Sequence, residues 1–489
     1  MKRILSGLAM LSLCIPLFAQ QVISRVDFGR RQPKPDFYEY SPADNGLVTL
    51  GPYSVASNRF LSLTKYDASL KKEWSVQLLE QNGRKTIDFL SVIGNHIFVF
   101  VTETLPREDV IKAYYYAYDL SGKVLAEEEI LSVYPNEKEQ KTGLQFVLSP
   151  NKRRLLCYKS LQTKREFETL LYYVFDDEGD FVQNGEVEVK YPDNKFRIRN
   201  VRISNNGNLF ILGKFYRTQV VREATDFQHI IYQYDIAAQQ GLEHKIVLGD
   251  LFINDLAFRV DRDENMYVAG FYSNRSTDQI AGTMLQKITP EGNIVMNAIE
   301  PFDANFLSNY LSRSQIDRGR ELQNFYMDPE NGIVLRSDGG VLLFAEKFYI
   351  TYQSYRDISG YWVEREIFHY DDVVLTSVSA EGRIEWHAII EKTQQSDNPN
   401  SLSFFSAVGA GGAYVFYEYK PRRNGFNVYS HQIGIDGQVT GRSPMFKDYK
   451  YGNEFYPRFC EQVSNDEALM VYMQNRGKIF TVARIRLEP

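Results

Sequence analysis

The stretch LTKYDASLKKEW, residues 63–74, contains an alternating strand, a tight turn and the start of a second strand. Its turn carries Asp67 and Ser69, whose side chains hydrogen-bond readily to a turn backbone. The pattern returns six more times along the chain. The seven copies begin at Leu63, Tyr116, Tyr173, Tyr232, Leu285, Thr376 and His431, with turns at Asp67, Asp119, Asp176, Asp235, Thr289, Ser379 and Ile435.

A second motif, a polar hairpin followed by an apolar strand, precedes each turn. Strands such as LFILGKFY (209–216) and MYVAGFYS (266–273) are apolar for most of their length, as expected of strands buried on both faces. The turn-to-turn spacing of 52 to 59 residues, with one interval of 90, indicates a repeat architecture. Eight hairpins occur, at Asp44–Gly46, Gly94–Asn95, Ser149–Asn151, Asn205–Asn208, Asp261–Asn265, Asp338–Gly340, Gly409–Gly412 and Asn465–Asp466.

Each repeat therefore contains four strands, and the repeats fill residues 21–489 as one all-β domain. We predict a single closed β-propeller of eight four-stranded blades, with seven blades as the alternative. The last repeat ends after the strand from Ile479 to Leu487, while QVISRVDFG (21–29) is a strand without a repeat of its own. We expect this N-terminal strand to complete the last blade, which would remove exposed sheet edges.

The first twenty residues have the features of a secretory signal peptide. Met1-Lys2-Arg3 precede an apolar run that ends near Phe18 and a small residue, Ala19. The run is shorter than the ~20 residues that a spanning helix needs. Cys14 follows the large Leu13, which favours a soluble protein over a lipid-anchored one. We therefore predict a cleaved signal peptide over residues 1–20, a periplasmic or secreted location and no membrane span.

Composition and motifs exclude several functions. The formal net charge of −6 and the lack of a basic run argue against nucleic-acid binding. No HExxH, CxxC, GxSxG or phosphate-loop motif occurs, so we assign no catalytic residue, metal site or cofactor. Carboxylates gathered in a propeller channel would escape this search, which leaves enzymatic activity open. Cys157 and Cys460 remain after processing, and whether they pair is also open.

Two insertions, residues 301–330 and 350–370, flank the sixth blade and are expected on one face of the disc. Asp303 is a plausible helix N-cap, which predicts a short helix after it. Binding residues often lie on loops of a rigid scaffold, and Tyr and Trp are common interface anchors. The alternative is a local core that holds the insertions together. The candidate partner-binding residues are Phe306, Tyr310, Tyr349, Tyr352, Tyr355, Tyr361 and Trp362.

Two resemblances to known proteins stand beside these patterns. The segments ASLKKEW (68–74) and SAEGRIEW (379–386) resemble the Asp-x-x-x-Gly-x-x-x-Trp repeats of quinoprotein-type propellers, which occur in eight-bladed quinone dehydrogenases and in an outer-membrane assembly lipoprotein. The stretches 266–288 and 373–396 are similar to uncharacterised secreted or periplasmic proteins of Bacteroidota. This resemblance implies an envelope propeller and supplies no catalytic residues.

We accordingly expect a non-catalytic binding or scaffold protein that docks on a periplasmic or outer-membrane complex. A secretion or assembly machine, such as the type IX secretion translocon, is one example of such a partner. The alternative is a small-ligand binder or enzyme that uses the central channel, either quinoprotein-like or glycan-active. Convergent carboxylates or a ring of Arg and Lys in the channel would favour this alternative.

Overall fold

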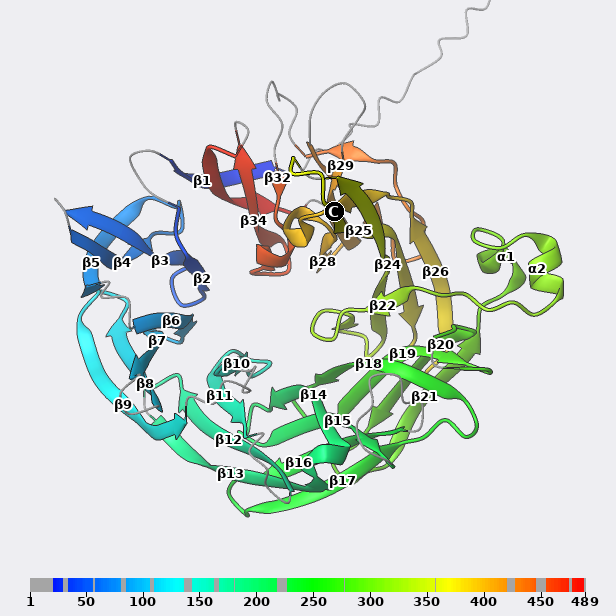
Figure 1. Cartoon of the computed structure of the whole chain (residues 1–489), viewed down its shortest axis with the longest axis horizontal. Helices are drawn as coiled ribbons and strands as arrows, with labels where there is room; N and C mark the ends of the chain where they lie inside the picture. Colours follow the sequence, from blue (N-terminus) through cyan, green and yellow to red (C-terminus); the bar gives the residue numbers. More distant parts are fainter. Residues whose placement is uncertain are drawn as a thin grey trace, which may run out of the picture.

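The computed structural model describes residues 21–29, 34–55, 58–80, 85–105, 110–135, 143–161, 167–179, 181–217, 227–276, 278–356, 358–419, 427–445, 454–474 and 477–487. The predicted signal peptide, with Cys14, lies outside these residues. The described strands form eight antiparallel sheets arranged in a ring about a central axis, which is a β-propeller (Figure 1). The predictions of an all-β propeller and of eight blades are confirmed.

The first four blades follow one another in sequence order, and each is a simple four-stranded meander. Blade 1 contains β2 (Phe37–Ser41), β3 (Gly46–Val55), β4 (Asn58–Tyr66) and β5 (Lys72–Glu80); blade 2 contains β6 (Lys85–Ile93), β7 (His96–Leu105), β8 (Val110–Asp119) and β9 (Val124–Pro135); blade 3 contains β10 (Gln145–Leu148), β11 (Arg154–Ser160), β12 (Phe167–Asp176) and β13 (Phe181–Pro192); blade 4 contains β14 (Phe196–Ile203), β15 (Leu209–Tyr216), β16 (Phe227–Asp235) and β17 (Gln240–Ile246).

The last four blades depart from this regularity in blades 6 and 8, where the inner strand is divided into two short pieces. Blade 5 contains β18 (Phe252–Val260), β19 (Met266–Ser273), β20 (Gly282–Ile288) and β21 (Ile294–Pro301); blade 6 contains β22 (Phe325–Met327), β23 (Ile333–Leu335), β24 (Val341–Arg356), β25 (Trp362–Val378), β26 (Ile384–Ile390) and β27 (Gln394–Ser396); blade 7 contains β28 (Phe404–Gly409), β29 (Gly412–Tyr419), β30 (Asn427–Ile433) and β31 (Ser443–Pro444); blade 8 contains β32 (Glu454–Phe455), β33 (Glu461–Gln462), β34 (Glu467–Gln474), β35 (Ile479–Arg486) and β1 (Gln21–Phe28).

The described helices are short and lie between strands. The α-helices α1 (Ala304–Leu307) and α2 (Arg313–Asp317) lie between blades 5 and 6, and the 3-10 helices are η1 (Asp193–Lys195), η2 (Pro399–Ser401) and η3 (Pro457–Phe459).

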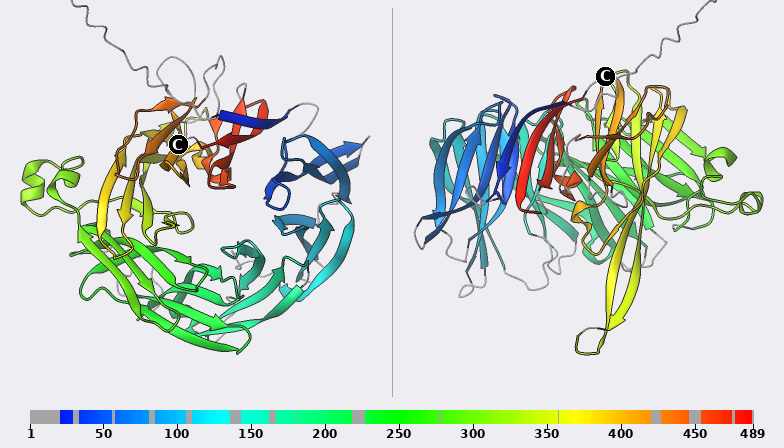
Figure 2. Two further views of the ribbon diagram at one scale, coloured as in Figure 1. Left: turned by 180° about the vertical axis from the view of Figure 1, so that it is seen from behind. Right: turned by 90° about the horizontal axis from the view of Figure 1, so that it is seen from above.

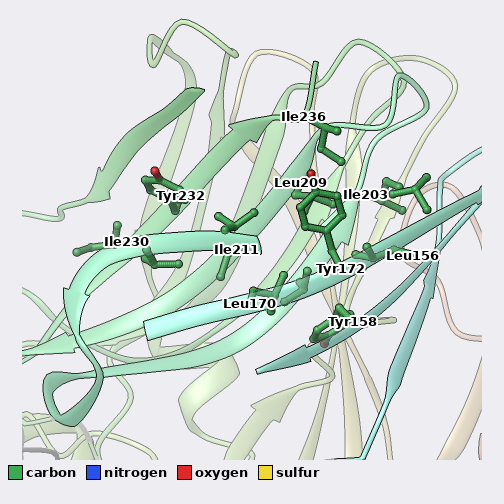
Figure 3. Close-up of a cluster of buried hydrophobic side chains, with 14 of the residues drawn as sticks. Leu156, Tyr158, Leu170, Tyr172, Ile203, Leu209, Ile211, Ile230, Tyr232 and Ile236 are labelled. Carbon is green, nitrogen blue, oxygen red and sulfur yellow. The ribbon is translucent and has the colours of Figure 1, made fainter. Parts of the chain in front are cut away.

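The hydrophobic core lies between neighbouring sheets rather than at one centre. Between blades 3 and 4, Leu170 and Tyr172 pack with Ile211 and Ile230 in one buried cluster (Figure 3). Every residue of the second strand of blade 5, β19, is buried, as its apolar sequence predicted. Burying one such large apolar side chain stabilises the fold by roughly 1.5–3 kcal/mol, so each blade depends on both neighbours.

The N-terminal strand joins the two ends of the ring. β1 pairs antiparallel with β35, from Gln21 opposite Arg486 to Phe28 opposite Phe480. Phe28 also packs on Tyr66 of blade 1, with 6.1 Å between the ring centroids. The Arg484 guanidinium donates to the carbonyl oxygens of Asn45 (3.1 Å) and Ala68 in the same blade. The expectation that residues 21–29 complete the last blade is confirmed.

The tryptophans of the segments 68–74 and 379–386 connect neighbouring blades. Trp74 Nε1 donates to the Leu120 carbonyl (2.9 Å), and Trp386 Nε1 donates to the Ile435 carbonyl (2.9 Å). Each acceptor lies in the outer turn of the following blade. A Cβ at Gly437, which has φ +80°, would lie 2.7 Å from the Trp386 ring. Glycine is required there because the indole lies against a backbone that is left-handed.

Candidate functional site

The first insertion forms a small core against blades 5 and 6. The Asp303 side chain accepts from the Phe306 backbone N–H (2.7 Å), so Asp303 is the N-cap of α1 as predicted. Phe306 is 5 % exposed and stacks on Phe302, with 4.3 Å between centroids. Tyr310 packs edge-on against Phe325 at 5.2 Å. Phe306 and Tyr310 therefore belong to a local core, as the alternative interpretation proposed, and Phe306 offers little surface to a partner.

The second insertion is a long two-stranded hairpin. β24 and β25 are 16 and 17 residues long, and their outer halves pair from Ile350 opposite Phe368 to Arg356 opposite Trp362. Figure 2 shows this hairpin projecting from one face of the disc, whereas α1 and α2 lie at the rim. The first insertion contacts β24 just before the second insertion begins, where Lys347 Nζ lies 5.7 Å from the Tyr310 ring centroid.

The candidate aromatic residues of the hairpin do not share one face. Directly opposite residues of an antiparallel pair lie on the same face, and neighbours along a strand alternate. One face, here called the Trp362 face, therefore carries Tyr352, Arg356, Trp362, Glu364 and Glu366. The Arg356 guanidinium lies 5.1 Å from the Trp362 ring centroid, consistent with this assignment.

The opposite face of the hairpin carries the other two strand tyrosines. Tyr349 stacks on His369, with 4.4 Å between centroids and 5° between planes, and is half-buried. Tyr355 lies opposite Val363 and is 45 % exposed. Tyr361, at the turn, is 73 % exposed. The seven candidate residues thus divide among a rim core, two hairpin faces and the hairpin turn.

A second candidate site lies in the central channel, which sequence reasoning could not resolve. Two adjoining cavities there have volumes of about 830 and 660 Å³. Both are lined by Lys152, Arg259, Asn331, Arg458 and Glu461. The loops that divide the inner strands of blades 6 and 8 supply Asn331 and Arg458, so these irregular segments shape the cavity walls.

Two arginines occupy corresponding positions on neighbouring inner strands. Arg202 and Arg259 are each the penultimate residue of their strand, β14 and β18. Arg202 Nη2 donates to the Pro329 carbonyl (3.1 Å), and Arg259 Nη1 donates to the Ile333 carbonyl (2.9 Å). Burial lowers the pKa of both groups, and for Arg259 the positive charge of Arg202 lowers it further. The channel therefore holds two neighbouring cations on one wall.

Acidic groups also reach the channel. Lys152 of blade 3 forms an ion pair with Glu461 of blade 8 across the channel. Burial raises the pKa of Glu39 to about 8, the Glu461 carboxylate adds to this rise, and Lys152 opposes it. Glu39 is consequently protonated at neutral pH. The channel thus combines an arginine-rich wall with acids that are mostly paired or uncharged.

A buried ion pair lies beside the larger cavity. Lys392 Nζ is 2.6 Å from Glu346 Oε1, and the Lys392 side chain is fully buried. Lys392 also donates to the Tyr370 carbonyl (2.9 Å) and to Gln394 Oε1 (2.8 Å). Glu346 accepts from Ser403 Oγ at 2.6 Å. These bonds tie the long hairpin strands to blade 7.

Three general features of the described residues bear on function. Cys157 is buried and Cys460 half-buried, and both are free thiols. Within the described ranges, no group of three or more His, Cys, Asp or Glu side chains gathers as a metal site. Along the same residues, no helix has the length and apolar character needed to cross a bilayer.

Comparison with known proteins gives no family. No protein-family model matches the chain, and no curated protein matches it. Among solved structures, the chain is similar to the WD40 domain of SCAP from fission yeast, at 8 % identity and TM-score 0.43, over 96 % of this chain and 94 % of that one. It is also similar to the β-propeller domain of the Trilobed protease from Pyrococcus furiosus, at 11 % identity and TM-score 0.35, over 83 % and 96 %. A protein of unknown function from Dyadobacter fermentans follows at 7 % identity and TM-score 0.31, over 71 % and 94 %.

Proposed function

We propose that this protein is a non-catalytic binding module of the cell envelope, exported through residues 1–20. In this proposal it docks on a periplasmic or outer-membrane protein complex, such as a secretion or assembly machine, by means of the β24–β25 hairpin. The observation that carries the proposal is the exposure of large aromatic side chains on a projecting element. Tyr352 is 64 % exposed and Trp362 is 69 % exposed.

The hairpin gains stability when a partner surface covers its exposed aromatic side chains. A two-stranded hairpin is marginally stable in water, and exposed apolar side chains on it gain free energy only when another surface covers them. Tyr and Trp bury a large area for the few rotatable bonds that they order. The hairpin also extends away from the disc, so a partner could cover it without opening the propeller (Figure 2).

The Trp362 face specifies the chemistry of the proposed partner. Glu364 and Glu366 lie on this face and form no ion pair with a described residue, while Arg356, on the same face, lies over the Trp362 ring. An apolar pocket with Lys or Arg at its rim would complement this face, since opposite charges at an interface increase the association rate and fix the register. We therefore propose that the partner is a protein with such a pocket.

The first test is to replace Tyr352 and Trp362 together with Ala (Y352A/W362A). Each hot-spot aromatic contributes about 2 kcal/mol or more to affinity, a loss of about thirtyfold on truncation. We expect the double variant to lose a partner that the wild-type protein captures from membranes, while the melting temperature stays unchanged. The measurement is affinity purification with quantitative mass spectrometry and a parallel thermal melt.

Gln353→Ala is the matched control, because Gln353 lies exposed on the opposite face of the same strand. This variant should recover the same partner at the wild-type yield. If Y352A/W362A is folded and also recovers that partner at the wild-type yield, docking through the Trp362 face is wrong.

A second candidate function is favoured by one observation. The arginine-rich wall is the feature that we expected of a small-ligand binder that uses the channel. A ligand site in the channel requires no change in the role proposed for the hairpin.

A further inference from the structure

We propose that the central channel binds a small organic anion, whose carboxylate or phosphate group is held by Arg259 and Arg458. This site goes beyond the docking function and does not depend on it. Both residues line both cavities. They come from different blades, Arg259 from an inner strand of blade 5 and Arg458 from η3 of blade 8.

Both arginines retain hydrogen-bonding capacity. Arg259 Nη1 donates to the Ile333 carbonyl, and Arg458 Nη2 donates to the Tyr370 hydroxyl at 3.0 Å. Within the described ranges, neither forms an ion pair with a carboxylate. A guanidinium carries five N–H donors, so several on each side chain are left for a ligand. Arginine donors arranged in a fork match the geometry of carboxylates and phosphates.

The acids of the cavity walls are largely engaged elsewhere. Glu461 pairs with Lys152, and Glu346 pairs with Lys392. Glu39 carries little negative charge at neutral pH, because its pKa is raised to about 8 mainly by burial. The charge of Arg458 also acts on Glu346 and lowers its pKa, but the hydrogen bonds of this carboxylate come from Lys392 and Ser403, which leaves the N–H groups of the Arg458 guanidinium to a ligand.

Three further acids lie on the cavity walls. Glu330 Oε1 is 3.9 Å from Arg202 Nη1. Asp328 Oδ1 accepts from the backbone N–H groups of Glu330 and Asn331, both at 2.8 Å. Asp36 lines the smaller cavity. Glu330 partly neutralises Arg202, whereas Arg259 and Arg458 form no ion pair with a carboxylate in the described part of the chain.

The larger cavity also suits the organic part of a ligand. Its volume of about 830 Å³ lies in the range of small-molecule sites, about 300–1,000 Å³. Tyr326, Phe344, Phe348 and Phe404 line it together with Arg259 and Arg458. Apolar and aromatic walls with a few convergent charges are the usual composition of a ligand pocket. The combination favours an anion with an apolar body over a bare inorganic ion.

The test is isothermal titration calorimetry of the purified protein with four probes: phenyl phosphate, benzoate, inorganic phosphate and uncharged benzyl alcohol. We expect phenyl phosphate or benzoate to bind, and their comparison shows which anionic group is preferred. Binding should weaken at high salt, because charge attraction at an open cavity is screened. Arg259→Gln and Arg458→Gln should each weaken it about tenfold or more, the loss expected for one charge-assisted contact.

Arg262→Gln is the matched control, since Arg262 lies exposed three residues beyond Arg259 in the β18–β19 turn. It should bind like the wild type. If Arg259→Gln does not fold, the affinity of Arg458→Gln tests the proposal alone, because Arg458 is exposed and its replacement should leave the fold intact. A thermal melt of Arg458→Gln shows whether that variant is folded. The proposal is overturned if no anionic probe binds the wild-type protein, if benzyl alcohol binds equally well, or if folded Arg458→Gln keeps the wild-type affinity.

Discussion

Deletion of residues 21–29 is expected to destabilise the protein by about 5 kcal/mol or more and to make it associate. The deleted strand β1 buries Val26 and Phe28, which are 8 % and 2 % exposed, in the cluster that joins blade 8 to blade 1. Burial of two such side chains contributes roughly 1.5–3 kcal/mol each. The backbone pairing with β35 is lost as well, which leaves an open edge that can pair with a second molecule.

Denaturant unfolding and light scattering after size exclusion would measure both effects. Phe28→Ala alone should cost about 3–5 kcal/mol, the usual range for a buried Phe. Ile23→Ser, on the same strand, is the control and should change little, because Ile23 is 41 % exposed. A deletion variant that is monomeric and as stable as the wild type would show that β1 does not hold the ring together.

Replacing Lys392 with Met is expected to cost about 3–5 kcal/mol, because it leaves the buried Glu346 carboxylate without its cation. Met has a similar volume, so the loss arises from charge rather than from packing. The double variant E346L/K392M removes both charges and should recover most of the stability. Arg383→Met is the matched control in the same blade, since its ion pair with Glu381 is exposed and contributes about 0–1 kcal/mol.

The loss in K392M should also depend on pH. Burial raises the pKa of Glu346 even beside Lys392, and removing the cation raises it further. A carboxyl whose pKa is higher in the folded state than in the unfolded state stabilises the fold at low pH and loses this contribution as pH rises. The deficit of K392M against wild type should therefore be smaller near pH 5 than near pH 8. An equal deficit at both pH values would mean that Glu346 does not carry the effect.

The repeated strands and turns of the blades could be predicted from the sequence because the residues that form each turn are close together in the chain. Asp67 Oδ1 accepts from the backbone N–H groups of Ser69 (2.8 Å) and Lys71 (2.9 Å). Asp119 does the same with Ser121 and Lys123 in the next blade. A turn stabilised by its own side chain needs no distant contact, so its residue pattern repeats visibly and reveals the blades.

The irregular parts depend on contacts that sequence spacing does not show. Pro329 and Pro457 lie where the inner strands of blades 6 and 8 are divided, and proline lacks the N–H that a continuous strand needs. The two prolines are visible in the sequence, but the placement of Arg259 and Arg458 in the walls of the same cavities depends on how the blades are arranged in the ring. The alternation of strand residues could have separated Tyr352 from Tyr355 at once, whereas the burial of Phe306 depends on packing against blade 5.

The most direct measurement of the docking account is site-specific photo-crosslinking in living cells of the source organism. A photo-reactive amino acid is placed at Tyr352 or at Trp362, and at Arg262 in a short turn outside the hairpin as the control. If the Trp362 face docks on a partner, both hairpin positions crosslink to the same envelope protein and position 262 does not. Crosslinks to that protein from position 262 but from neither hairpin position, or no hairpin crosslink at all, would contradict it.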